Sequence, residues 1–168
     1  MESRLKLLGH PIHPMLVMFP LGLFVTAVIF DFVDVAGGPR LLGEVAYWNI
    51  VAGLIGGVLA ALAGLVDYLA IPAGTRAKRV GAAHGLINGA VMALFLVAWL
   101  ARRGAEQHAA PTWVFVLELV ALVGGGVSAW LGGELVDRLG VGVDEDANLD
   151  APARLETGLI RRSRPAAR

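Results

Sequence analysis

The chain contains no cysteine, and its charges balance: 14 lysines and arginines face 14 aspartates and glutamates. The absence of cysteine excludes disulfides, thiolate metal sites and cysteine-ligated iron–sulfur clusters. A net charge of zero provides no general attraction to nucleic acid, so we expect no nucleic-acid partner. Two common catalytic motifs are also missing, the Gly-x-Ser-x-Gly elbow and the Gly-x-x-x-x-Gly-Lys phosphate loop. The sequence therefore assigns no catalytic residue and leaves open whether the protein is an enzyme.

Apolar residues make up 57% of the 168 positions, above the ~45–50% that is usual in soluble domains. They gather in four runs that are apolar on every side, and a helix needs roughly 20 such residues to cross a bilayer. We predict an all-α integral membrane four-helix bundle. Its helices span about 14–34, 47–71, 80–101 and 111–136. Residues 1–143 form the transmembrane domain, and 144–168 form a flexible cytoplasmic tail.

The basic residues predict the orientation, because positive charge near helix ends favours the cytoplasmic side. More of them flank one side of the predicted helices, so we expect both termini in the cytoplasm of a bacterial inner membrane. The first run is not followed by a clear small-x-small cleavage site, which favours a retained helix over a cleaved signal peptide.

The two halves of the chain resemble each other. Gly56-Gly57-Val58 matches Gly125-Gly126-Val127, and Leu65-Val66-Asp67 matches Leu135-Val136-Asp137 once a one-residue insertion near Glu134 is allowed. The pattern favours two parallel helical-hairpin repeats. On the second helix Gly53, Gly56, Ala60 and Gly64 form one stripe of small residues, which suits close packing or a homodimer.

Four crossings bring several polar residues to one end of the bundle. His10 and His13 lie at the start of the first helix, with Pro14 expected at the first helical position and His13 as the cap. His84 lies near the start of the third helix, and Asn88 follows on the same face. Asp67 and Glu134 lie near the ends of the second and fourth helices, and so we expect them beside the histidines.

Glu118 is the main polar residue of the opposite half, about 10 Å inside the fourth helix. Asp31 and Asn49 are placed to approach it, and Arg102 or Arg103 could pair with it. Such an acidic site, together with the histidines, is one way to build a proton path. His108, in the loop between the third and fourth helices, is expected to be solvated.

The residues described above resemble a prokaryotic membrane-protein family catalogued as domain of unknown function 2231. The resemblance covers about residues 7–143. Its matching pieces are His10-Pro11-Ile12-His13-Pro14, Gly64-Leu65-Val66-Asp67, His84 with Asn88, Gly132-Gly133-Glu134-Leu135-Val136 and Gly140-Val141-Gly142-Val143. Asp137 and Leu139 depart from its pattern, where an aromatic and a histidine are expected. Some members are joined to Rieske iron–sulfur domains, and so the resemblance implies a redox setting with an iron–sulfur protein as partner.

The leading hypothesis is a cofactor at the histidine end, in a component of electron transfer. His13 and His84 could ligate a haem b, with His10 and Asn88 beside it. A metal set of His10, His13, His84, Asp67 and Glu134 would suit iron, zinc or manganese. Two alternatives stay open: a protein that handles protons or ions, and a structural membrane subunit without a cofactor.

Overall fold

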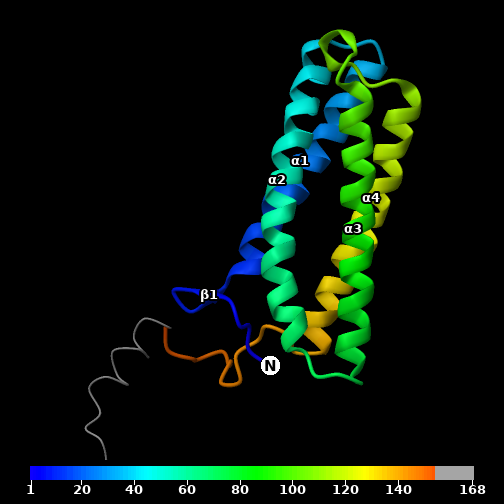
Figure 1. The fold of residues 1–168 in the computed structure, drawn as a ribbon. Coiled ribbons are helices and arrows are strands. Elements are labelled where there is room, and N and C mark those ends of the chain that lie inside the picture. The colour runs from blue at the N-terminus through cyan, green and yellow to red at the C-terminus, as the bar shows by residue number, and fades with distance from the viewer. Residues whose placement is uncertain (154–168) are drawn as a thin grey trace, which may run out of the picture.

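The computed structural model describes residues 1–153 and confirms the predicted all-α four-helix bundle (Figure 1). The helices are α1 (Ile12–Val35), α2 (Leu41–Ala70), α3 (Arg76–Arg102) and α4 (Thr112–Gly133). All four are long and apolar enough to cross a membrane. A 3₁₀ turn, η1 (Glu106–His108), precedes α4, and a π-helical turn, η2 (Glu134–Arg138), extends it.

Local sequence explains where the helices end. Gly37 follows α1 with a positive φ of 89°, a conformation that glycine adopts without the steric penalty of a Cβ atom. Gly74 turns the chain between α2 and α3 in the same way. Thr75 then caps α3 by accepting a hydrogen bond from the backbone nitrogen of Lys78 at 3.1 Å. Each connection is short, so consecutive helices lie antiparallel.

Two details at the N-terminus differ from the prediction. The helix α1 begins at Ile12 with Pro11 as its cap residue, so His13 lies inside the first turn and is not the cap. Before it, β1 (Lys6–Leu7) and β2 (His10–Pro11) form a small antiparallel hairpin, with Lys6 opposite Pro11. Strands of two residues are too short to leave an alternating pattern, and the sequence therefore did not predict them.

We call the end of the bundle that holds Met1 and the starts of α1 and α3 the N-terminal end. The opposite end, with the α1–α2 and α3–α4 connections, is the far end (Figure 1). The predicted tail begins at the N-terminal end, where Asp144 pairs with Lys6 at 2.8 Å. Residues 154–168, including most of that tail, lie outside the described part of the chain.

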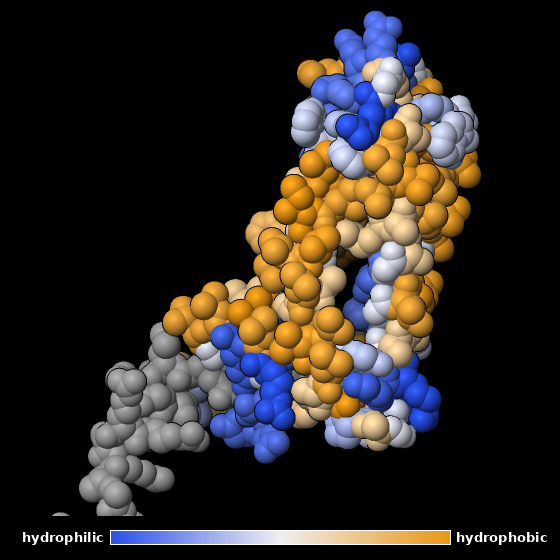
Figure 2. Space-filling view, in the orientation of Figure 1, coloured by the Kyte–Doolittle hydropathy of each residue, from blue (hydrophilic) through white to orange (hydrophobic). Residues whose placement is uncertain are grey.

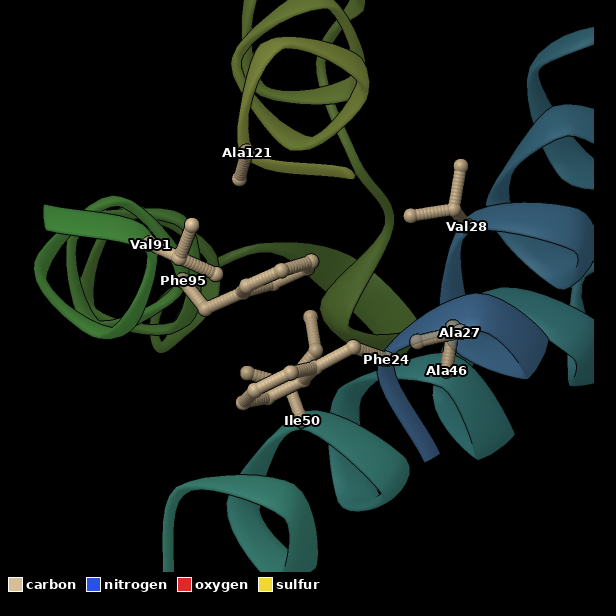
Figure 3. Packing of buried hydrophobic residues seen from close by; sticks show 8 residues of the cluster. All are labelled: Phe24, Ala27, Val28, Ala46, Ile50, Val91, Phe95 and Ala121. Atoms are coloured by element: carbon tan, nitrogen blue, oxygen red, sulfur yellow. The ribbon is translucent and has the colours of Figure 1, made fainter. Parts of the chain in front are cut away.

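Side chains from all four helices form the core at mid-height of the bundle. It contains the buried residues Phe24, Ala27, Val28, Ala46, Ile50, Val91, Phe95 and Ala121 (Figure 3). The rings of Phe24 and Phe95 stack in parallel, with centroids 4.0 Å apart. This contact joins the α1–α2 hairpin to α3.

The predicted stripe of small residues on α2 packs against α1. A Cβ atom on Gly53 would lie 2.6 Å from the Phe24 ring, and one on Gly56 would lie 3.4 Å from Pro20. A Cβ on Gly64 would lie 2.8 Å from the His13 ring. Without these glycines the two helices could not approach so closely. The stripe therefore builds the first hairpin.

Candidate functional site

The structure brings two of the predicted histidines together inside the bundle. His13, in the first turn of α1, and His84, in α3, lie next to each other. Their ring centroids are 6.4 Å apart, and the ring planes are inclined at 87°. We call His13 and His84 the imidazole pair.

Each imidazole is held by the second helix of its own hairpin. His13 Nδ1 lies 2.8 Å from the carbonyl oxygen of Ala60, and His84 Nδ1 lies 2.9 Å from that of Ser128. A main-chain carbonyl only accepts hydrogen bonds, so both Nδ1 atoms carry a proton. In the neutral imidazole the lone pair then sits on Nε2, the nitrogen that remains available to a metal.

The two anchors are equivalent positions of the hairpins. Gly64 follows Ala60 by one helical turn and lies under the His13 ring, and Gly132 follows Ser128 and lies beside the His84 ring. The correspondence supports the predicted repeat. The equivalent anchor residues are 68 positions apart in the chain, one fewer than the 69 that separate the matching glycine motifs. The π-helical turn at Glu134–Arg138 lies where the alignment of the two halves needs an insertion.

Asn88 is placed on the imidazole pair as predicted. Its Nδ2 lies 3.1 Å from His84 Nε2, and Ser128 Oγ lies 3.0 Å from His84 Nδ1. Asn88 therefore donates to the lone pair of His84. Within the described residues, His13 Nε2 has no hydrogen-bond partner.

Four glycines of α3 and α4 leave open space on the surfaces of these two helices. A Cβ atom on Gly85 or Gly89 of α3, or on Gly125 or Gly126 of α4, would meet no atom within 4 Å. Figure 2 shows the apolar surface of the molecule interrupted by an opening between α2 and α3, with hydrophilic side chains at its depth.

The five-residue metal set that the sequence predicted is not brought together. His10 lies exposed in β2, outside the bundle. Asp67 accepts hydrogen bonds from the Ser3 hydroxyl at 2.7 Å and the Arg4 backbone nitrogen at 2.7 Å. Glu134 pairs with Arg76 at 2.6 Å. Among residues 1–153, no three histidine, aspartate or glutamate side chains are grouped as a metal site would require. The four crossings do bring these residues to one end of the bundle. Their side chains nevertheless bind local partners and do not converge on the imidazole pair.

A second polar site lies near the far end, and sequence reasoning identified its members only as candidate neighbours. Arg102 is wholly buried, and its two terminal nitrogens each lie 2.7 Å from an oxygen of Asp31. It also donates to Glu118 at 3.2 Å and to the carbonyl oxygens of Gly43 and His108. We call Asp31, Arg102 and Glu118 the arginine cluster. Asn49 is not part of it, because its amide donates to Thr26.

His108 is not simply solvated, which corrects the expectation from sequence. Its Nδ1 lies 2.7 Å from a carboxylate oxygen of Glu44, and its ring stacks on Tyr47 with centroids 3.9 Å apart. The stacking fixes the loop before α4 over the end of α2. As a result, the His108 carbonyl is held where Arg102 can donate to it.

These features define a four-span helical membrane protein with a histidine pair in one half and a buried arginine in the other. Over residues 9–145 the chain matches the family described as "Predicted membrane protein (DUF2231)", and it belongs to that family. No curated protein and no solved structure matches it.

Proposed function

We propose that this membrane protein binds a haem b through His13 and His84 and serves in electron transfer. The observation that carries the proposal is the geometry of the imidazole pair. A histidine nitrogen lies about 2 Å from its metal and roughly 1 Å from its ring centre, so two imidazoles on opposite sides of one metal have centres about 6 Å apart. The rings of His13 and His84 are separated by 6.4 Å.

The hydrogen bonds around the pair support ligation. A histidine that binds a metal usually donates its other ring N–H to a carbonyl or carboxylate, which fixes its tautomer and orientation. Ala60 and Ser128 supply such carbonyls to His13 and His84. Asn88 would have to release His84 Nε2 on ligation, and its amide would then be free to donate to the cofactor or to water.

A haem fits these residues better than a bare metal ion. A bare divalent ion takes three or four protein ligands, and only two histidines meet here. A haem needs only axial ligands from the protein, because its porphyrin supplies the other four nitrogens.

A haem held by two imidazoles exchanges single electrons and offers no open coordination position, which favours electron transfer over oxygen chemistry. The pair lies near the N-terminal end of the spans, since His13 is in the first turn of α1 and His84 is four residues, or about 6 Å, beyond Val80, where the apolar part of α3 begins. A cofactor at that depth is within reach of a redox partner at the N-terminal surface. We propose an iron–sulfur protein as that partner.

Absorbance spectroscopy of the protein purified in detergent from haem-supplemented cells tests the proposal. We expect a Soret band, a low-spin reduced spectrum and about one haem per chain by the pyridine haemochrome assay. His13→Ala and His84→Ala should each abolish low-spin binding. His10→Ala is the matched control, because His10 lies exposed outside the bundle, and it should retain the haem.

A folded wild-type protein that is colourless and does not take up added haemin would overturn the proposal. Circular dichroism and size-exclusion chromatography establish that the sample is folded. Metal analysis of the same sample distinguishes a bare-metal protein from a subunit without a cofactor.

A further inference from the structure

The arginine cluster at the far end has no part in haem binding, and its charges do not balance. Asp31, Arg102 and Glu118 are all fully buried, which places two carboxyl groups beside one guanidinium. The guanidinium is committed to Asp31, which it binds through two short hydrogen bonds. Glu118 receives a single, longer bond through Oε1.

Glu118 is left incompletely bonded in its ionised form. Its Oε2 is buried and finds no hydrogen-bond partner in the described part of the chain. An ionised carboxylate with a bare oxygen is costly inside a protein, and much more so within a membrane span. A proton on Glu118 removes the excess negative charge and turns the carboxyl into a hydrogen-bond donor.

We propose that the arginine cluster is a proton-binding site, and that Glu118 holds one exchangeable proton at neutral pH. The charged groups around Glu118 are consistent with this. Helix α1 contributes Asp31 and, one turn further out, Asp34; α3 contributes Arg102. Helix α2 and η1 contribute the carbonyl groups of Gly43 and His108, which accept from Arg102. Glu44 is engaged by His108 and Trp48 and so is turned away from Glu118.

The cluster lies close to the far-end surface of the protein. Asp34 is buried, lies three residues from Asp31, and lines an open depression of about 430 Å³ together with Arg40 and Pro111. The exposed guanidinium of Arg40 lies 3.4 Å from Asp34 and leaves that carboxylate only weakly paired. Asp34 therefore lies between the far-side water and the cluster, one turn along the same face of α1 as Asp31.

Infrared spectroscopy of the protein in lipid bilayers at neutral pH tests the proposal and requires no haem. We expect the carbonyl stretch of a protonated carboxylic acid, shifted in D₂O and shifted again when glutamate is labelled with ¹³C. The band should disappear in Glu118→Gln. It should also disappear in Asp31→Asn, because a single carboxyl group then faces Arg102 and becomes ionised. Glu106→Gln, in the exposed loop, should leave it unchanged.

Absence of the band from folded wild-type protein would overturn the proposal, as would a band that survives in both cluster variants. A shift on labelling of aspartate rather than glutamate would move the proton to Asp31 and overturn its assignment to Glu118. Recording the spectra in His13→Ala as well separates this result from the haem proposal, since loss of haem should leave the band in place.

Discussion

The ring of Phe24 lies flat against the ring of Phe95, with centroids 4.0 Å apart and planes within 5° of parallel. Ile50 and Val91 pack in the same cluster, so the middle of the bundle is sealed by apolar side chains (Figure 3). The imidazole pair lies on one side of this seal and the arginine cluster on the other. The seal keeps a proton at Glu118 from reaching the histidines directly.

Phe95→Ala should destabilise the bundle by about 3 kcal/mol, the lower end of the range for phenylalanine in soluble cores. The cost is at the lower end because lipid is as apolar as the core, and only the packing is lost. Unfolding in mixed detergent and SDS, followed by circular dichroism, measures the change.

Phe19→Ala is the control for that substitution, because Phe19 is also a phenylalanine of an apolar span but is 58% exposed. It should change the free energy of unfolding by less than about 1 kcal/mol. Equal losses in both variants would show that the ring stack has no special weight in stability.

Gly64→Ala should reduce haem affinity by about 10-fold or more, the effect typical of disturbing a ligand's supporting contacts. A Cβ atom there would lie 2.8 Å from Cε1 of His13, so the ring must move. Titration with haemin, read from the Soret band, gives the affinity. Gly22→Ala on α1, where a Cβ meets nothing within 4 Å, should bind haem as the wild type does.

Much of the fold could be predicted from the sequence because lipid imposes a strong pattern. The apolar runs predicted helices near 80–101 and 111–136, and the structure has Arg76–Arg102 and Thr112–Gly133. The second helix starts earlier than predicted, at Leu41, because Glu44 interrupts the apolar run without ending the helix. Hydropathy locates the part of a helix in the membrane and not its polar ends.

The candidate site was predictable only in part. The number of membrane crossings predicted that His13 and His84 lie at the same end of the bundle. Helical periodicity predicted that Asn88 lies beside His84. The same reasoning failed for Asp67, whose partner is Ser3, in a segment that no pattern located. Arg102 was missed as a buried residue because it lies at a helix end, where arginine usually extends to water. A useful signal was that two acidic residues, Asp31 and Glu118, occur in apolar helices at a similar distance from the far end, because two buried carboxyl groups need a basic partner.

Arg102→Gln should destabilise the protein by about 3–5 kcal/mol, because it leaves the carboxylate of Asp31 buried without its partner. The double variant Arg102→Gln with Asp31→Asn removes both charges and should recover part of the loss. Unfolding in SDS mixtures gives the coupling energy between the two sites. Arg103→Gln, at the exposed neighbour, should have little effect, and equal losses at both arginines would contradict a buried ion pair.

Asp67→Asn should release the N-terminal segment without loss of haem. The carboxylate accepts from Ser3 and from the Arg4 backbone, and loss of charged hydrogen bonds costs about 1.5–3 kcal/mol. Hydrogen exchange at the first residues should accelerate by tenfold or more, as measured by mass spectrometry. Asp137→Asn, on an exposed neighbouring turn, serves as control. Loss of haem in Asp67→Asn would contradict this prediction and would show that Asp67 contributes to cofactor binding.

The orientation predicted from the basic residues can be tested directly, because the chain has no cysteine of its own. Glu106→Cys introduces one thiol in the exposed α3–α4 connection, and Glu145→Cys introduces one at the N-terminal end. In spheroplasts, a membrane-impermeant maleimide should label the thiol at position 106 and not the thiol at position 145. Lysis should make both reactive, which controls for access. The reverse pattern would place the termini outside, and the arginine cluster would then face the cytoplasm, where it would draw its proton from the opposite side of the membrane.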